Sequence, residues 1–186
     1  MSNKTAVLLM AYGTPRSPEE ILPYYTDIRR GRPPTEEQLA DLKARYDAIG
    51  GISPLAARTE AQRDALQRAL DAIAPEKFVV QLGLKHAHPM IEETVDDIAR
   101  QGIKNIIALV LAPHYSSYSI GQYVGRAQAA AEPHGISVVG VESWAIEPAF
   151  IDFLAADMAA KKAAMPERTR VLFTAHSLPQ RIIDGG

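Results

Sequence analysis

The sequence contains no cysteine among its 186 residues. A chain without thiols forms no disulfide framework, binds no iron–sulfur cluster and supplies no thiolate to a zinc site. Any metal chemistry therefore depends on histidine, tyrosine or carboxylate side chains. The absence is compatible with a reducing compartment.

Long apolar runs are missing as well. The first run, residues 6–11, is too short to span a bilayer, and it leads into Tyr-Gly-Thr-Pro instead of a cleavage site of small residues. We therefore expect no integral membrane segment, no secretion signal and a cytoplasmic protein.

The sequence has little excess charge and none of the common cofactor motifs. Its 20 basic residues face 22 acidic ones, so we expect no nucleic-acid partner. There is no G-x-G-x-x-G after a strand, no G-x-x-x-x-G-K-[ST] and no G-x-S-x-G. A nucleotide enzyme or an α/β-hydrolase is therefore disfavoured.

What the sequence does contain is an alternation of short apolar runs with longer amphipathic stretches, which is typical of βα units. The runs are rich in Val, Ile and Leu, as buried parallel strands are. We predict an α/β fold with a doubly wound, Rossmann-like parallel sheet. The expected strands are residues 6–11, 78–84, 105–112, 136–141 and 170–174.

Six amphipathic stretches are expected to form helices. Three of them begin with a capping-box pattern, Ser17-Pro18-Glu19-Glu20, Thr35-Glu36-Glu37-Gln38 and Thr59-Glu60-Ala61-Gln62. The others begin at Pro89, after Ser119 and at Pro148. Residues 12–77 separate the first two expected strands, far more than one crossover needs. We predict one domain over residues 1–186 with a helical insertion at about residues 17–75.

Polar residues follow every expected strand, where parallel α/β sheets bind their ligands. Four of the five histidines are placed at this edge, at positions 86, 88, 114 and 176. A basic segment, Arg29-Arg30-Gly31-Arg32, together with Arg45, suits carboxylates or phosphates. Seven tyrosines lie in or near the same segments. These residues alone predict a pocket for an acidic ligand, lined by His, Tyr and Arg.

Each of these residues also has a purely structural interpretation. A histidine at a strand end is more often structural than catalytic, and an arginine run is more often a solvated helix end. Tyr25 and Tyr46 fall at helix-periodic positions that favour packing, whereas Tyr12, between a strand end and Gly-Thr-Pro, has no obvious packing role.

Several motifs, in order along the whole chain, resemble the ferrochelatase family. They are Ala11-Tyr12-Gly13-Thr14-Pro15, Ile28-Arg29-Arg30-Gly31-Arg32, Arg45-Tyr46-x-x-Ile49-Gly50-Gly51-Ile52-Ser53-Pro54-Leu55, Gly83-Leu84-Lys85-His86, Leu111-Ala112-Pro113-His114 and Thr174-Ala175-His176-Ser177-Leu178-Pro179. The Tyr12 variant resembles the members from Gram-positive bacteria that insert iron into coproporphyrin III.

The resemblance implies a chelatase-like fold of two similar doubly wound domains with a cleft between them. This chain corresponds to the N-terminal half, and we expect the C-terminal domain, which supplies a glutamate facing the metal-side histidine, to be absent from it. The missing half, or a second chain, would then complete the site.

The resemblance also implies roles for individual residues. His176 would be the catalytic residue on the metal side, receiving pyrrole protons or holding the incoming Fe²⁺, and Tyr12 would be an axial ligand of the product iron. The residues expected to hold propionates or line the macrocycle pocket are Arg29, Arg45, Tyr46, Ser53 and Tyr123, with Lys85 and His86 nearby. The substrates would be a porphyrin, coproporphyrin III or protoporphyrin IX, and Fe²⁺, with no tightly bound cofactor.

Two alternatives remain open on the sequence. One is a truncated module that binds tetrapyrrole or haem without inserting metal. The other is an α/β enzyme that acts on a small anionic metabolite, with His86 and His176 as acid and base.

Overall fold

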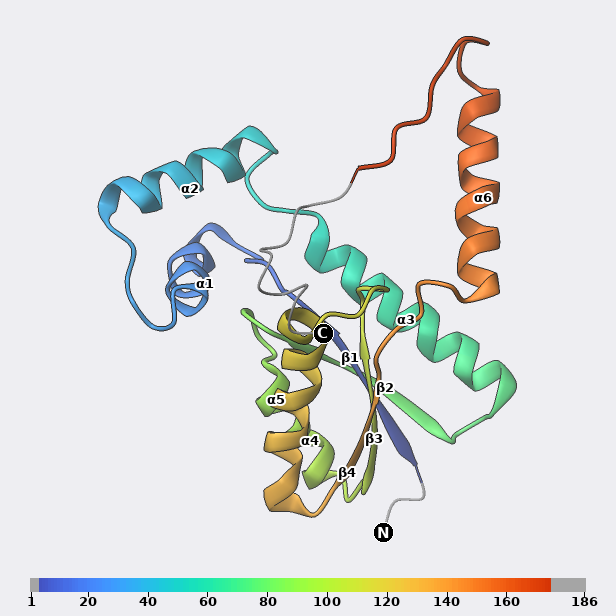
Figure 1. The fold of residues 1–186 in the computed structure, drawn as a ribbon. Helices are drawn as coiled ribbons and strands as arrows, with labels where there is room; N and C mark the ends of the chain where they lie inside the picture. The colour runs from blue at the N-terminus through green and yellow to red at the C-terminus, as the bar shows by residue number, and fades with distance from the viewer. Residues whose placement is uncertain (1–3, 175–186) are drawn as a thin grey trace.

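A four-stranded parallel sheet forms the centre of the molecule (Figure 1). The computed structural model describes residues 4–174. The strand order is β2-β1-β3-β4, where β1 is Thr5–Ala11, β2 is Phe78–Leu84, β3 is Asn105–Val110 and β4 is Ser137–Val141. In the register, Thr5 of β1 lies opposite Phe78 of β2, and Ala6 lies opposite Ile106 of β3. The α/β fold with a parallel sheet is as predicted, and four of the five expected strands form.

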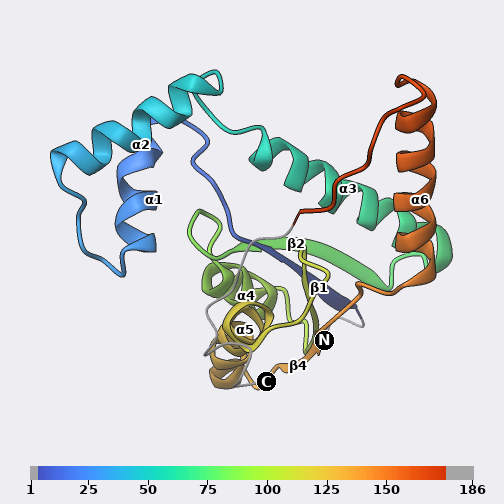
Figure 2. The same cartoon turned by 45° about the horizontal axis from the view of Figure 1, so that its top comes forward.

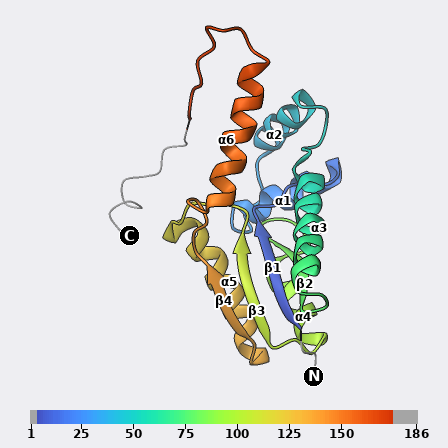
Figure 3. The same ribbon diagram turned by 90° about the vertical axis from the view of Figure 1, so that its right-hand side faces the viewer.

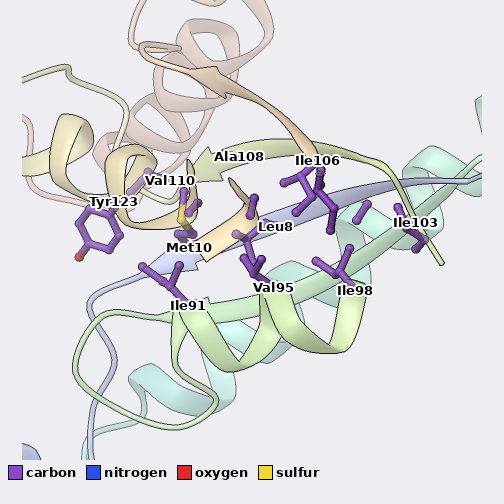
Figure 4. Close-up of a cluster of buried hydrophobic side chains, with 14 of the residues drawn as sticks. Leu8, Met10, Ile91, Val95, Ile98, Ile103, Ile106, Ala108, Val110 and Tyr123 are labelled. Atoms are coloured by element: carbon purple, nitrogen blue, oxygen red, sulfur yellow. The ribbon is translucent and has the colours of Figure 1, made fainter. Parts of the chain in front are cut away.

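One face of the sheet is covered by α4 (Ile91–Arg100) and α5 (Gln122–Ala131). Apolar side chains recur along α4 with helical spacing, and Ile91, Val95 and Ile98 are completely buried against the sheet. Figure 4 shows these side chains between the α4 ribbon and the strands, with Leu8 and Met10 of β1 at the centre of the cluster. This cluster is the main hydrophobic core.

The opposite face is covered by α3 (Leu55–Ile73), so helices lie on both faces and the sheet is doubly wound (Figure 3). Leu66 and Leu70 of α3 pack on a smaller buried cluster, which consists of Val7, Leu9, Val80 and Leu82. The other two helices between β1 and β2 are α1 (Ile21–Ile28) and α2 (Glu36–Ala48), and α2 buries none of its residues.

The three expected capping boxes have different outcomes. Thr35 and Gln38 form one at the start of α2, as predicted. The Ser17 side chain makes no capping hydrogen bond: the backbone N–H of Glu20 donates to the Ser17 carbonyl, and the Glu20 carboxylate accepts from the backbone N–H of Arg16. Thr59 lies inside α3, and its hydroxyl donates to the carbonyl of Leu55 at 2.8 Å. The helix begins four positions earlier, after Pro54, because that proline supplies a favourable starting φ.

The expected fifth strand, residues 170–174, is wrong. After β4 the chain forms α6 (Pro148–Ala163), which extends away from the sheet, and the described residues that follow turn back from its far end without forming a strand (Figure 2). Leu172 and Phe173 are 83% and 84% exposed. An apolar run becomes a strand only where a neighbouring strand offers its N–H and C=O groups, and residues 170–174 pair with neither edge of the four-stranded sheet.

Candidate functional site

Tyr12 is the first residue beyond β1, at the edge where all four strands end. Gly13 follows with φ of +88°, and a Cβ there would lie 2.9 Å from the Cβ of Ala87. Only glycine fits this turn, because other residues rarely adopt such a φ and no space is left for a side chain. The turn leaves the Tyr12 side chain 45% exposed above the sheet edge.

Two cavities meet at Tyr12. The first, here called the α3 cavity, has a volume of about 610 Å³; it is lined by Ala11, Tyr12, Leu55, Arg58, Thr59, Ala61, Gln62, Val110, Leu111, Ala112, Ser119 and Tyr123. The second, here called the α2 cavity, has a volume of about 420 Å³; it is lined by Tyr12, Gly13, Thr14, Tyr24, Leu42, Arg45, Tyr46, Ile49, Ser53 and Leu55. Tyr12 and Leu55 line both cavities.

The C-terminal end of α2 supplies the polar side of the α2 cavity. The helix ends in a Schellman motif, in which Gly51 N–H donates to Tyr46 O at 2.8 Å and Gly50 N–H donates to Asp47 O at 3.0 Å. Gly50 has φ of +99°, the left-handed conformation that this motif requires. The motif turns the chain back so that Ser53 joins Tyr46 in the cavity.

Two side chains of α2 line the α2 cavity: Tyr46 lies within hydrogen-bond distance of Thr14, whereas Arg45 makes an exposed ion pair. The Tyr46 hydroxyl lies 3.3 Å from the hydroxyl of Thr14, which is 4% exposed and fixes the ring against the turn after β1. Arg45 forms an exposed ion pair with Asp41 at 2.6 Å. A pair so exposed contributes little to stability, so a ligand carboxylate can replace Asp41 at small cost.

His86 lies beside Tyr12, with ring centroids 4.5 Å apart. Its Nδ1 is 2.6 Å from Oδ2 of Asp27 on α1. Burial lowers the pKa of His86, an effect that Lys85 and Arg126 reinforce, whereas Asp27 acts in the opposite direction. Because a carboxylate only accepts hydrogen bonds, the neutral ring carries its proton on Nδ1 and leaves Nε2 as an acceptor.

Lys85 and Tyr123 form a second pair at the same edge. Lys85 Nζ lies 5.1 Å from the centroid of the Tyr123 ring and donates to Gln122 Oε1 at 2.8 Å. Burial, and then the charge of Arg126, lowers the pKa of Lys85. Arg126 also donates to the Lys85 carbonyl and forms a bidentate pair with Glu92, which ties the end of β2 to α5.

Phenol groups dominate the site and remain protonated at neutral pH. Burial, followed by the charge of Asp27, raises the pKa of Tyr12. Burial raises the pKa of Tyr123 to about 12 and also raises the pKa of Tyr24. In the absence of a metal, these groups therefore act as uncharged hydrogen-bond donors and acceptors. Figure 4 shows Tyr123 at the end of the core cluster, with its oxygen directed away from the other labelled side chains.

The structure brings most of the predicted site residues to this edge. Lys85 and His86 line neither cavity but contact Tyr123 and Tyr12, which do. Arg29, which ends α1, lines neither cavity, and its guanidinium lies 5.5 Å from the centroid of the Tyr25 ring. His176 lies outside the described residues. His88 pairs with Glu93 and is 77% exposed. No group of three or more potential metal ligands from His, Asp and Glu occurs within residues 4–174.

Sequence reasoning missed Arg58 of the α3 cavity wall, Tyr24 in its role as a cavity wall, Asp27, Gln122 and Arg126. Asp27 and His86 are separated by 59 positions, and Lys85 and Arg126 by 41, so no local spacing connects them. Only the packing of α1 and α5 against the end of β2 makes these contacts.

The fold and the site define an α/β protein with a hollowed, largely apolar edge where phenols, a guanidinium and an ammonium group converge. Such an edge suits a large planar ligand with carboxylates. Residues 4–186 match the family profile described as Ferrochelatase, and the chain belongs to the ferrochelatase family.

Three curated relatives illustrate the relationship, and each is described as a coproporphyrin III ferrochelatase. The protein from Oceanobacillus iheyensis is 50% identical, with 98% of this chain and 60% of the relative covered. The protein from Geobacillus kaustophilus is 48% identical, with 100% and 61% covered. The protein from Staphylococcus aureus strain Mu50 is 46% identical, with 99% and 62% covered.

The chain thus spans about 60% of the length of these relatives. Among the helices of the described residues, none is both long and apolar enough to cross a membrane.

Proposed function

We propose that this chain binds coproporphyrin III and forms one wall of the cleft in which Fe²⁺ is inserted into the porphyrin. The observation that carries the proposal is the position of Tyr12, a protonated phenol at the junction of two cavities, with Arg45 in one of them. The family and the printed names of the relatives support the reaction and the substrate. The cytoplasmic location remains a prediction from the sequence.

The residue roles of the proposal follow from their positions and from the resemblance. The macrocycle would lie across Tyr12, whose oxygen becomes an axial ligand once iron is in the ring. Arg45, Tyr46 and Ser53 would hold propionates from the α2 side, and Lys85, His86 and Tyr123 would line the pocket from the β2 and α5 side. Arg29 would reach a propionate from the end of α1. His176 would receive the pyrrole protons on the opposite face of the ring.

The proposal also concerns the organisation of the domain. Residues 1–186 would be the N-terminal part of a two-domain enzyme, with α1 to α3 as the segment that holds the porphyrin. A further part of the protein, or a second chain, would close the cleft over the metal-side face of the ring.

Mixing the protein with coproporphyrin III and Fe²⁺ under anaerobic conditions tests the proposal. Insertion converts the free-base Soret and four-band visible spectrum into that of the iron complex. Conversion above the protein-free rate, lost in the His176→Ala variant while porphyrin binding persists, would support the assigned chemistry. Conversion that persists in His176→Ala would refute the role of His176.

A second candidate is a module that holds tetrapyrrole without inserting metal. It is favoured by the composition of the two cavities, whose walls provide phenols, Ser and Thr hydroxyls, guanidinium groups and apolar surface, all of which can hold a ligand. Quenching of Trp144 emission by porphyrin without spectral conversion would support this candidate. If porphyrin caused neither quenching nor a Soret shift, both candidates would be wrong. A small anionic metabolite as substrate receives no support from the family.

A further inference from the structure

The face of α3 that packs on the sheet is apolar at Leu66 and Leu70 but polar nearer the start of the helix. Leu66 and Leu70 lie over the strands and pack on the smaller core cluster. One and two turns earlier, the same face carries Gln62 and Arg58, and both line the α3 cavity. The helix extends beyond the ends of the strands there, and its packing face becomes polar at that point.

The side chain of Arg58 has no hydrogen-bond or ion-pair partner among the described residues. On the same helix, Arg63 pairs with Asp64 at 2.6 Å, and Glu60 pairs with Arg16 at 2.8 Å. Arg45, in the α2 cavity, pairs with Asp41. By contrast, the hydrogen bonds and ion pairs of residues 4–174 include none made by the Arg58 side chain. A guanidinium at a largely apolar hollow is therefore available to a ligand.

These two arginines line different cavities, and the two cavities share one phenol. Arg58 lines the α3 cavity, Arg45 lines the α2 cavity, and Tyr12 belongs to both walls. A planar ligand that lies across Tyr12 with carboxylates on opposite edges can engage both guanidinium groups at once. A ligand with its carboxylates on one edge only can engage one of them.

We propose that Arg58 binds a carboxylate of the ligand in the α3 cavity, opposite the carboxylate held at Arg45, and so selects a porphyrin with carboxylates on all sides. This inference rests on the proposed function. The guanidinium fork suits a carboxylate because two parallel N–H groups can donate to its two oxygens. The ligand class is a tetracarboxylate macrocycle, in preference to one with two adjacent carboxylates.

The chain offers a matched control for a test. Arg68 is another exposed arginine of α3 whose side chain makes no hydrogen bond or ion pair among the described residues, and it lines neither cavity at Tyr12. Arg58→Gln and Arg68→Gln remove the same charge from the same helix. A loss of affinity that follows only from the net charge of the chain therefore appears in both variants, and a specific contact affects only the first.

The experiment is a titration of the full 186-residue chain with coproporphyrin III and, separately, with protoporphyrin IX. The Soret shift reports binding, and quenching of Trp144 gives an independent signal. Trp144 is close to the site because its indole N–H donates at 3.0 Å to the carbonyl of Val110, a residue of the cavity wall. Thermal melts of each variant show whether it folds.

We expect Arg58→Gln to weaken coproporphyrin III binding about tenfold, as for the loss of one hydrogen-bonded charged pair. Protoporphyrin IX binding should change by less than about twofold, and Arg68→Gln should leave both affinities within about twofold. Arg58→Lys keeps the charge without the fork and should fall between wild type and Arg58→Gln.

Three results would overturn the inference. If Arg58→Gln binds coproporphyrin III like the wild type, Arg58 holds no carboxylate. If Arg58→Gln and Arg68→Gln lose affinity equally, the effect is only the net charge of the helix. If both porphyrins weaken equally, Arg58 does not select between them. Failure of the wild type to bind any porphyrin would refute the proposed function itself, a result distinct from all three.

Discussion

Helices α4 and α6 both contain many apolar residues but differ in how many of them they bury. α4 buries Ile91, Thr94, Val95 and Ile98 against the sheet, whereas α6 buries none of its residues. Yet α6 is the more apolar of the two in composition, with Phe153 and Leu154 exposed by 64% and 42%. Composition therefore does not decide which helix stabilises the fold. The decisive property is a single apolar stripe with a surface to receive it.

The same contrast separates the core from the site. The sheet with α4 and α5 holds the main buried core, while the carboxyl edge, with α2 and the start of α3, is hollow and carries the phenol and guanidinium groups of the site on a largely apolar surface. We therefore expect substitutions in the first region to change stability and those in the second to change ligand binding. The following variants test that separation.

The largest effect on stability is expected from Ile98→Ala. Ile98 is completely buried between α4 and the sheet, so the truncation leaves a cavity and should lower the free energy of unfolding by about 3 kcal/mol. Leu154→Ala on α6 is the control and should cost about 0.5 kcal/mol or less. Urea unfolding monitored by circular dichroism measures both. Equal losses would mean that α6 contributes to stability as α4 does.

Gly13→Ala should have the next largest effect, because it touches both regions. The substitution combines an unfavourable φ with a contact 2.9 Å from Ala87, and we expect a loss of about 2 kcal/mol. At Gly50 a Cβ meets nothing within 4 Å, so Gly50→Ala should show the cost of the φ alone, about 1 kcal/mol. A larger loss at position 50 than at position 13 would contradict the close approach as the reason for Gly13.

Tyr12→Phe should leave stability almost unchanged while it alters the site. Tyr12 is 45% exposed, and we expect a change in unfolding free energy within about 0.5 kcal/mol. Porphyrin binding should persist because the ring remains, but the ferric coproporphyrin complex should lose the absorption that arises from tyrosine ligation. An identical visible spectrum in the variant would exclude Tyr12 as the axial ligand.

The smallest effect on stability should come from protonation of His86. Its pKa is lowered in the folded chain, mainly by burial, so the unfolded chain binds the proton more readily. The contribution of neutral His86 to the free energy of unfolding is therefore complete above the unfolded pKa of about 6.5, and it decreases as the pH falls below that value.

Asp27→Asn sharpens this prediction. The Asp27 carboxylate raises the pKa of His86 against the effect of burial, so its removal should lower that pKa further. An NMR titration of the His86 ring measures the shift. Asp41→Asn, which removes the partner of Arg45 on α2, is the control and should leave the His86 titration unchanged. A rise in the pKa of His86 in Asp27→Asn would contradict the direction.

The sheet could be predicted because its strands are defined by local apolar runs. The bounds of β2 agree with the prediction, and those of the other three strands differ by one or two residues at an end. Residues 170–174 have the same local pattern, but no local property states whether a partner strand is adjacent. Thr59 shows a similar limit: its sequence context resembles a cap, yet Pro54 starts the helix earlier.

The site could be predicted in part from strand ends and from the family resemblance. Tyr12, Lys85 and His86 directly follow their strands, so sheet topology alone brings them together. Asp27 and Arg126 reach the same place on separate helices, and their contacts depend on how those helices pack. Arg58 was missed because its role depends on tertiary structure: it lies in a cavity wall and its guanidinium has no acidic partner among the described residues.

The pairing of β1 with β2 joins Thr5 to Phe78 across the whole segment that contains α1, α2 and α3. Loop-closure entropy grows only with the logarithm of length, so each doubling of such a connection costs roughly 0.6 kcal/mol. The rate of pairing is more sensitive, because contacts distant in sequence form late. During synthesis, β1 can therefore pair with β2 only after the whole connection has emerged. The long connection that shapes the binding surface slows folding, while its cost in final stability is small.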